Sequence, residues 1–372
     1  MPPNSQLSKW LKSFTTKPRR APQNPLCYTE PANCSRRSKV KVPASESGRY
    51  TITVAKLRIS VVQYLNTTPL VRGFTHGPLH GKYDLSFTVP SECAEALRTG
   101  AADVAIIPAI EYQRIVSQGI GLTILPGLAI ASKERVRSLL LISKMPIRQA
   151  RRIALDRSSR STQALVNILA ARRWQIAPEF FEADPDPAAM LVDSDAALVI
   201  GDAALRIAIA AERHVAPGPD GEWVASASTA AIPQLENSTQ LHIYDVVKEW
   251  WHLTEKPAVL AVWAARNEVI TAELAADFLA SRDFGLAHLP EICAEAAQQL
   301  HLPEPELRLY LEKNIDYTLD EENLQGLLRF FHESHAQNLV GPLNPITIAS
   351  GPASPARFID FAPARNTASS RA

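Results

Sequence analysis

Short apolar runs alternate with helical patterns along most of this sequence, and few folds accommodate that order. Patterns of buried strands occur at "KLRISVV" (56–62), "ADVAIIPAI" (102–110), "RIALD" (152–156) and "AALVIG" (196–201). Helical patterns lie between them, for example "STQALVNILAARRW" (161–174). Strands that alternate with helices form sheets with helices packed on both faces. The sequence therefore predicts an α/β protein with parallel sheets.

The order of these segments also predicts two lobes. Long extended segments near 122–144 and 257–265 separate two α/β runs, as strands that cross between lobes would. We expect a first lobe at 56–140, a second lobe at 141–256, and a return to the first lobe at 257–338. Helical periodicity dominates this last part of the chain. Ligands of such proteins bind where the carboxyl ends of strands face a cleft.

The segments outside the lobes differ in composition. Residues 1–55 are basic and rich in Pro and Ser, and residues 339–372 are rich in Pro, Ala and Ser, so both are predicted to be disordered tails. A polar segment at 212–240, with many Pro, Gly and Ser residues, predicts a long loop. Residues 57–372 carry 28 Lys and Arg against 36 Asp and Glu. This acidic balance argues against a nucleic-acid-binding groove in the folded part.

The sequence also bears on compartment and membrane. It has no signal peptide with a continuous apolar segment, and no apolar run of about 18 residues that could span a membrane. Its four cysteines, Cys27, Cys34, Cys93 and Cys293, have neither zinc-ligand spacing nor the pattern of a disulfide framework. We therefore expect a cytoplasmic protein. The sequence leaves the oligomeric state open, with a homodimer as one alternative.

Polar residues after predicted strands mark the candidate site. "QYLNTTPL" (63–70) follows the first strand, and its Asn66 either caps the next helix or presents its amide to the cleft. Pro108 ends the second apolar run, and Glu111 after it suits the first turn of a helix. Ser138 opens a later strand, where a lone serine is usually structural.

A cluster of hydroxyl groups opens the helix after the strand at 152–156. In "DRSSRST" three serines surround Arg160, although a helix cap needs only one of them. The helix start and the hydroxyls could bind a carboxylate or phosphate, and Arg160 either adds a contact to the anion or points into solvent. After the strand at 196–201, Gly201 permits close approach of the backbone and Asp202 can cap a helix.

Several common catalytic motifs do not occur. The sequence has no Walker-type phosphate loop, no GxGxxG, no GxSxG and no HExxH. Its nine histidines do not fall at the strand ends, and His76 and His80 are expected to be exposed in a loop. An enzyme with these features is not expected to depend on a histidine base, a metal or a cofactor.

In combination, five of these motifs resemble one known family. They are "LRISVVQYLNTTPL", "VPSECAEALRTGAADVAIIPAIEYQRI", "LAIASKERVRSLLLISK", "IALDRSSRST" and "AALVIGDAAL". They resemble, in this order, the MqnA family, the chorismate dehydratases of the futalosine route to menaquinone. The likeness covers about 57–205 and continues more weakly to about 335. Thr68 departs from the family pattern, because relatives often carry a basic residue there.

The resemblance implies a two-lobed, type II periplasmic-binding-protein-like fold with crossing hinge strands. It also implies loss of water from chorismate to give 3-[(1-carboxyvinyl)oxy]benzoate, with the substrate's own enolpyruvyl carboxylate as the base. Asn66 and Ser138 would be the catalytic residues, and the helix start at 159–161 would hold a substrate carboxylate. The full set of residues expected to contact the substrate is Gln63, Tyr64, Pro108, Ser159, Arg160, Ser161, Gly201 and Asp202.

Two other functions remain compatible with the same fold. One is a carboxylate-binding protein without catalysis, which would need export or a lipid anchor, and the sequence shows a signal for neither. The other is the sensing domain of a regulator, but no DNA-binding pair of helices precedes the fold. The sequence thus favours the enzyme.

Overall fold

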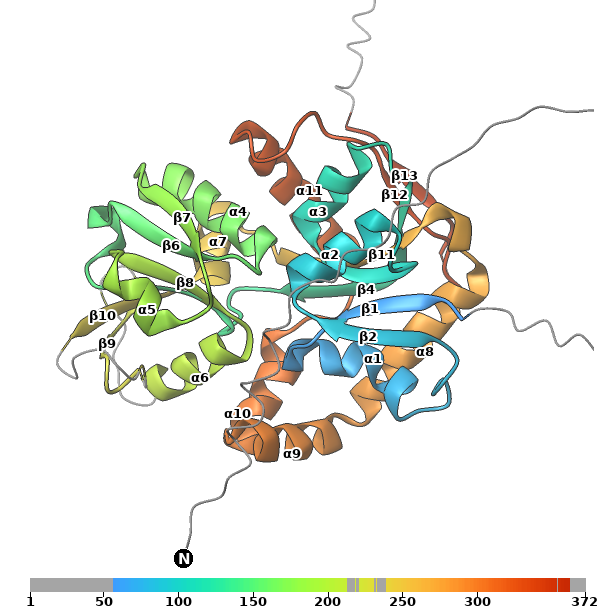
Figure 1. Ribbon diagram of the computed structural model, residues 1–372, viewed down its shortest axis with the longest axis horizontal. Coiled ribbons are helices and arrows are strands. Elements are labelled where there is room, and N and C mark those ends of the chain that lie inside the picture. The colour runs from blue at the N-terminus through green and yellow to red at the C-terminus, as the bar shows by residue number, and fades with distance from the viewer. Residues whose placement is uncertain are drawn as a thin grey trace, which may run out of the picture. The chain divides into compact units, whose positions relative to one another are not determined.

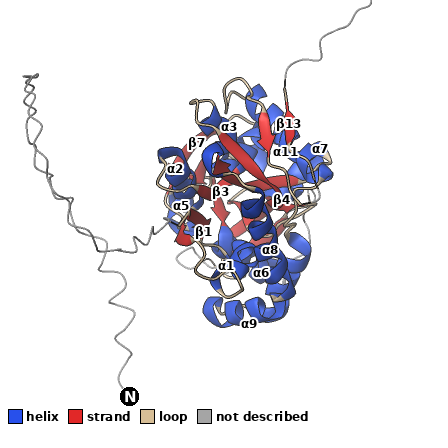
Figure 2. Cartoon of the chain, turned by 90° about the vertical axis from the view of Figure 1, so that its right-hand side faces the viewer, coloured by secondary structure: helices blue, strands red, loops and turns tan. Residues whose placement is uncertain are grey.

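Two β-sheets with helices packed against them make up the structure, a computed structural model (Figure 1). It describes residues 56–212, 218, 221–230, 232, 239–352 and 354–361. The predicted tail at 1–55 lies outside these residues, as does most of the segment at 213–238. Figure 2 shows the strands running through the interior with helices around them.

The first sheet has seven strands in the order β13-β12-β4-β11-β3-β1-β2. Their bounds are β1 Arg58–Val62, β2 Asp84–Thr88, β3 Val104–Pro108, β4 Leu122–Ser132, β11 Ala258–Arg266, β12 Ile346–Ile348 and β13 Arg357–Ile359. β1 lies parallel to both β2 and β3, whereas β11 is antiparallel to its neighbours β3 and β4. Because β1 and β3 are parallel, their carboxyl ends lie at the same edge of the sheet.

Helices from both ends of the chain cover this first sheet. They are the short η1 Leu65–Thr67, α1 Thr68–Thr75, α2 Pro90–Thr99, α3 Ala109–Val116, α8 Ala272–Ala287, α9 Leu289–Leu300, α10 Glu304–Leu309 and α11 Glu321–Ala336, with η5 Tyr310–Asn314 after α10. α1 packs closely on α8, since a Cβ at Gly285 would lie 1.8 Å from the carbonyl oxygen of Pro69. The Ser281 hydroxyl also donates to the Leu70 carbonyl at 2.9 Å. These contacts hold α1, which follows the turn at 63–67, against α8.

The second sheet has six strands in the order β7-β6-β8-β5-β10-β9. Their bounds are β5 Leu139–Ser143, β6 Arg152–Asp156, β7 Glu179–Ala183, β8 Ala196–Ile200, β9 Trp223–Ser226 and β10 Gln240–Asp245. The helices of this lobe are α4 Arg160–Leu169, α5 Pro187–Val192, α6 Gly201–Glu212 and α7 Val246–Thr254. β6 lies parallel to β7 and β8, so β6 and β8 also end at one edge.

The chain crosses between the two sheets twice, once through 133–138 and once through α7. In the first crossing Arg137 has a φ of 66°, a left-handed conformation that is costly for a residue with a side chain. The Asp245 carboxylate stabilises this turn by accepting the backbone N–H of Val136 at 3.0 Å and of Arg137 at 2.6 Å. The same carboxylate caps α7. The Asp245 carboxylate thus connects the two crossings by hydrogen bonds, next to Ser138, which follows the turn.

Three expectations from the sequence need correction. The sheets are mixed rather than parallel, because periodicity reveals strands but not their direction. The expectation of disorder from 339 is wrong for 339–352 and 354–361, where β12 and β13 extend the first sheet. The segment at 212–240 contains a strand, β9, which pairs with β10. Within the described part of the chain, no helix has the length and apolar character needed to span a membrane.

Candidate functional site

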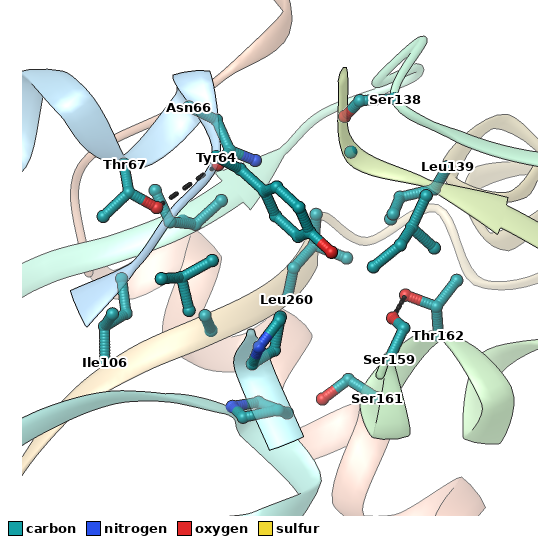
Figure 3. A pocket seen from close by; sticks show the side chains of 17 residues that line it. Tyr64, Asn66, Thr67, Ile106, Ser138, Leu139, Ser159, Ser161, Thr162 and Leu260 are labelled. Carbon is teal, nitrogen blue, oxygen red and sulfur yellow. Dashed lines mark hydrogen bonds between the residues drawn. The ribbon is translucent and has the colours of Figure 1, made fainter. Parts of the chain in front are cut away.

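A cavity lies between the two sheets, where the carboxyl ends of β1, β3 and β8 and the start of α4 come together (Figure 3). The volume of this cavity is about 60 Å³. The residues that line it are Val62, Tyr64, Asn66, Thr67, Pro90, Ile106, Pro108, Ile130, Ser138, Leu139, Ser159, Ser161, Thr162, Ile200, Gly201, Leu260 and Ala261. It therefore draws on both lobes and on the first crossing.

The lining combines apolar walls with uncharged polar groups. Isoleucine, leucine, valine and proline side chains form most of the wall, while the polar groups are hydroxyls and one amide. None of the described residues that line the cavity carries a charge. Figure 3 shows the Tyr64 ring projecting into the middle, with Ser138 on one side and Ser159, Ser161 and Thr162 on another. Such a site binds a ligand through hydrogen bonds and helix dipoles rather than through ion pairs.

The start of α4 presents backbone N–H groups that no side chain caps. Ser159 is the N-cap residue, but its hydroxyl donates to the Thr162 hydroxyl at 2.7 Å instead of bonding to the helix backbone. The Ser161 hydroxyl accepts the backbone N–H of Ile110, at the start of α3, at 3.2 Å. The capping interpretation of the serine cluster is therefore wrong. Uncapped N–H groups at the positive end of a helix form an anion-binding site.

Asn66 likewise does not cap a helix. It lies in η1, and neither η1 nor α1 has a side-chain cap. Its Oδ1 accepts a hydrogen bond from the Thr67 hydroxyl at 3.3 Å, which leaves the amide N–H₂ group as a donor on the cavity side. Ser138 is buried, with 1% of its surface exposed. The two predicted catalytic residues thus line the same cavity, Asn66 from the first lobe and Ser138 from the first crossing.

Tyr64 and Gly201 meet across the cavity. Gly201, at the start of α6, has a φ of 67°, and a Cβ there would lie 3.0 Å from the Tyr64 ring. Burial raises the pKa of the Tyr64 phenol, and a hydrogen bond with Ser158 partly lowers it. The phenol therefore stays protonated and can donate a hydrogen bond. The structure also brings Pro108, Ser159 and Ser161 to this cavity, as the sequence predicts.

Three residues predicted to contact substrate do not line the cavity. Arg160 pairs with Glu111 of the other lobe at 2.9 Å, so its charge is directed to that carboxylate. Gln63 is exposed, and with Asp202 it lines a separate cavity beside α1 and α9. The Asp202 carboxylate accepts the backbone N–H of Leu65 at 3.2 Å, and burial raises its pKa. Arg160 and Asp202 thus connect the lobes outside the cavity.

Sequence reasoning missed several lining residues. Thr67 and Thr162 stand beside predicted residues, and attention to the neighbouring hydroxyls would have identified them. Pro90 follows β2 as Pro108 ends β3, so the same signal of a proline after a strand would have found it. The apolar residues Ile130 and Leu260 come from β4 and β11, and only the tertiary structure reveals that they reach the cavity.

The described residues also contain no group of three or more His, Cys, Asp or Glu side chains that could hold a metal ion. The described cysteines, Cys93 and Cys293, are buried free thiols in the first lobe. Burial raises the pKa of each thiol to about 11, so both remain protonated and poor nucleophiles at neutral pH. The chemistry available in the cavity is therefore that of hydroxyl, amide and backbone N–H donors.

Solved structures with the same arrangement of lobes include binding proteins. The chain matches protein AF1704 from Archaeoglobus fulgidus over 77% of its own length and 98% of that protein, with 16% identity and a TM-score of 0.57. It matches the alkanesulfonate-binding protein SsuA from Xanthomonas axonopodis pv. citri over 77% and 95%, with 15% identity and a TM-score of 0.52. The periplasmic aliphatic sulphonate binding protein SsuA from Escherichia coli matches over 76% and 88%, with 16% identity and a TM-score of 0.50.

These likenesses establish the fold, which is the two-lobed type II periplasmic-binding-protein-like fold expected from the sequence. A family model gives more specific information. Residues 57–217 and 229–336 match the model of a family described as menaquinone biosynthesis. The match includes every residue that lines the cavity. The chain therefore belongs to the menaquinone biosynthesis family, as its resemblance to the MqnA family indicates.

Proposed function

We propose that this protein is a chorismate dehydratase, which removes water from chorismate to give 3-[(1-carboxyvinyl)oxy]benzoate in menaquinone biosynthesis. The observation that carries the proposal is the cavity itself, where the uncapped start of α4 faces Asn66 and Ser138 across apolar walls. Membership of the menaquinone biosynthesis family supports the pathway. We place the reaction in the cytoplasm, in keeping with the free thiols of Cys93 and Cys293.

The start of α4 suits one carboxylate of chorismate. A carboxylate there would accept hydrogen bonds from the backbone N–H groups of the first turn and from the hydroxyl of Ser161, whose oxygen already accepts the N–H of Ile110 and whose hydrogen is free. The interaction of an anion with a helix N-terminus contributes about 0.3–1 kcal/mol at exposed sites and up to about 2 kcal/mol where it is partly buried. All polar groups of this site are neutral, which suits an anionic substrate that supplies its own base.

The reaction needs a base and a group that assists the departing hydroxyl. A proton leaves the ring carbon that carries the ether, hydroxide leaves the adjacent carbon, and the two combine as water while the ring becomes aromatic. In line with the resemblance to MqnA, the enolpyruvyl carboxylate of the substrate accepts the proton. Among the described residues, the cavity lining contains no histidine and no carboxylate that would compete for this role. The enzyme mainly orients the substrate and excludes water.

In this proposal Asn66 and Ser138 act on the departing hydroxyl. An amide does not titrate in the useful range, so Asn66 hydrogen-bonds rather than transfers protons. The Asn66 N–H₂ group and the Ser138 hydroxyl each donate a hydrogen bond to the oxygen that leaves, and these bonds also orient the substrate. Both contacts strengthen as negative charge develops on that oxygen, which is how such donors lower a barrier.

A carboxylate-binding protein without catalysis is the alternative. The likeness to alkanesulfonate-binding proteins favours it, because these also have this fold and are named for binding an anion. The two functions differ in what happens to the ligand. Incubation of the purified protein with chorismate, followed by mass spectrometry, separates them. A product lighter than chorismate by one water supports the dehydratase, whereas bound but unchanged chorismate supports the alternative.

A further inference from the structure

Tyr310 lies directly behind Ser138, outside the cavity lining. It begins η5, which follows α10, and only 1% of its surface is exposed. Its hydroxyl donates a hydrogen bond to the Ser138 Oγ at 2.9 Å. The two residues are 172 positions apart in the sequence, so the contact depends on the packing of η5 against the first crossing.

This hydrogen bond determines what the Ser138 hydroxyl can do. A serine hydroxyl has one hydrogen to donate and an oxygen that accepts. The Tyr310 hydroxyl donates to the Ser138 oxygen from outside the cavity lining. The hydrogen of the Ser138 hydroxyl is therefore free to be donated into the cavity. A hydroxyl whose oxygen already accepts a hydrogen bond is also polarised into a better donor.

The surroundings of Tyr310 link it to the second catalytic residue as well. Burial raises the pKa of the Tyr310 phenol, while hydrogen bonding with the Ser138 and Asn66 side chains acts in the opposite direction. The phenol thus stays protonated at neutral pH and remains a donor. The Ser138 backbone is held separately, since its carbonyl accepts the N–H of Gly201 at 2.9 Å. Loss of the phenol hydroxyl should therefore release the side chain of Ser138 without moving its backbone.

We propose that Tyr310 is a positioning residue for the dehydration, which directs the hydroxyl hydrogen of Ser138 toward the departing hydroxyl of the substrate. The inference rests on the proposed function. It extends the site by a residue that touches neither the substrate nor the cavity surface.

The substitution that tests it is Tyr310→Phe, which removes the hydroxyl and keeps the ring. We expect kcat for chorismate to fall about tenfold or more, the rate equivalent of one lost hydrogen bond, with KM nearly unchanged. Tyr317→Phe is the matched control. Tyr317 is also buried and interacts electrostatically with Tyr310, and its hydroxyl has no hydrogen-bond partner among the described residues, so its removal should leave kcat unchanged.

Two further measurements separate positioning from general damage. In a Ser138→Ala background, Tyr310→Phe should cause a much smaller loss of kcat than in the wild type, because most of its effect passes through the Ser138 hydroxyl. An equal loss in both backgrounds would overturn the inference. In crystal structures, Ser138 should change rotamer in Tyr310→Phe but not in Tyr317→Phe. An unchanged Ser138 rotamer in Tyr310→Phe would overturn the role of Tyr310, whether or not the wild-type protein converts chorismate. Failure of the wild-type protein to convert chorismate would refute the proposed function instead.

Discussion

Single hydroxyl groups in this site serve contacts that a local sequence pattern does not reveal. Ser161 accepts a backbone N–H from the other lobe, and Ser138 accepts the hydroxyl of Tyr310. The serine cluster and Asn66 were recognisable as candidates because they follow predicted strands. Whether each side chain caps its own helix or faces the cavity depends on distant partners, so the sequence left both alternatives open. For these residues, the structure decides between a helix cap and a place in the cavity wall.

Gly201 provides a test of the contact across the cavity. Gly201→Ala should lower the free energy of unfolding by about 1–2 kcal/mol for the left-handed backbone. It should also raise KM for chorismate, because the new Cβ displaces the Tyr64 ring. Gly119→Ala is the control, since Gly119 has a φ of 82° but nothing within 4 Å of the added Cβ. Chemical denaturation and steady-state kinetics measure both effects, and equal KM values in the two variants would contradict the role of Tyr64.

At the scale of elements, the carboxyl ends of β1, β3 and β8 place the site. This part was predictable, because strand periodicity and the polar residues that follow can be read from the sequence. β12 was not predictable, since it has three residues and pairs with β4 at a single position, Ile348 with Ile124. Nor could periodicity show that β11 is antiparallel to β3. Short strands and strand direction depend on tertiary pairing rather than on local composition.

The start of α4 gives a prediction at this scale. Ser159→Asp would place a negative charge at the proposed carboxylate site, so KM for chorismate should rise at least about tenfold. Ser159→Asn is the control, because asparagine is a comparable N-cap without a charge and should have the smaller effect. Circular dichroism verifies that both variants are folded. Equal KM values for the two variants would show that the substrate's carboxylate binds elsewhere.

At the scale of the whole molecule, contacts between the lobes surround the cavity. Arg160 pairs with Glu111, Asp202 accepts the N–H of Leu65, and Ser161 accepts that of Ile110. The two-lobed arrangement was predictable from the two α/β runs. The second crossing is α7, however, rather than the expected segment at 257–265, which forms β11 of the first sheet. The contacts between the lobes were not predictable. From the residues alone, Arg160 was a possible contact to an anion and Asp202 a possible helix cap, and both were included among the residues expected to contact the substrate. The structure assigns both to the junction between lobes.

Asp202 makes this junction sensitive to pH. Burial raises its pKa above the ordinary value of 3.8, so the folded state holds the proton more tightly than the unfolded state. The free energy of unfolding therefore decreases as the pH rises from below the ordinary pKa of an aspartate to above the raised pKa of Asp202. Asp202→Asn removes the buried charge and keeps an acceptor for Leu65. Its Tm should exceed that of the wild type at about pH 7, and the difference should shrink toward about pH 3.

The exposed N-cap residue Asp186 supplies the control for this measurement. Asp186→Asn replaces one good N-cap with another, so its Tm should follow the wild type with little change across the same pH range. Thermal unfolding of all three proteins at several pH values gives the comparison. If the difference in Tm between Asp202→Asn and the wild type did not change with pH, the buried charge of Asp202 would not be its cause.

The central claim is that Asn66, in the cavity between the lobes, takes part in the dehydration of chorismate. The most direct test is kcat of Asn66→Ala, measured beside chorismate binding by calorimetry. We expect the wild-type protein to release the dehydrated aromatic product, and the variant to bind chorismate while kcat falls about 100- to 1,000-fold. An unchanged kcat would remove Asn66 from the active site. A wild-type protein that binds chorismate without converting it would contradict the assignment as a dehydratase.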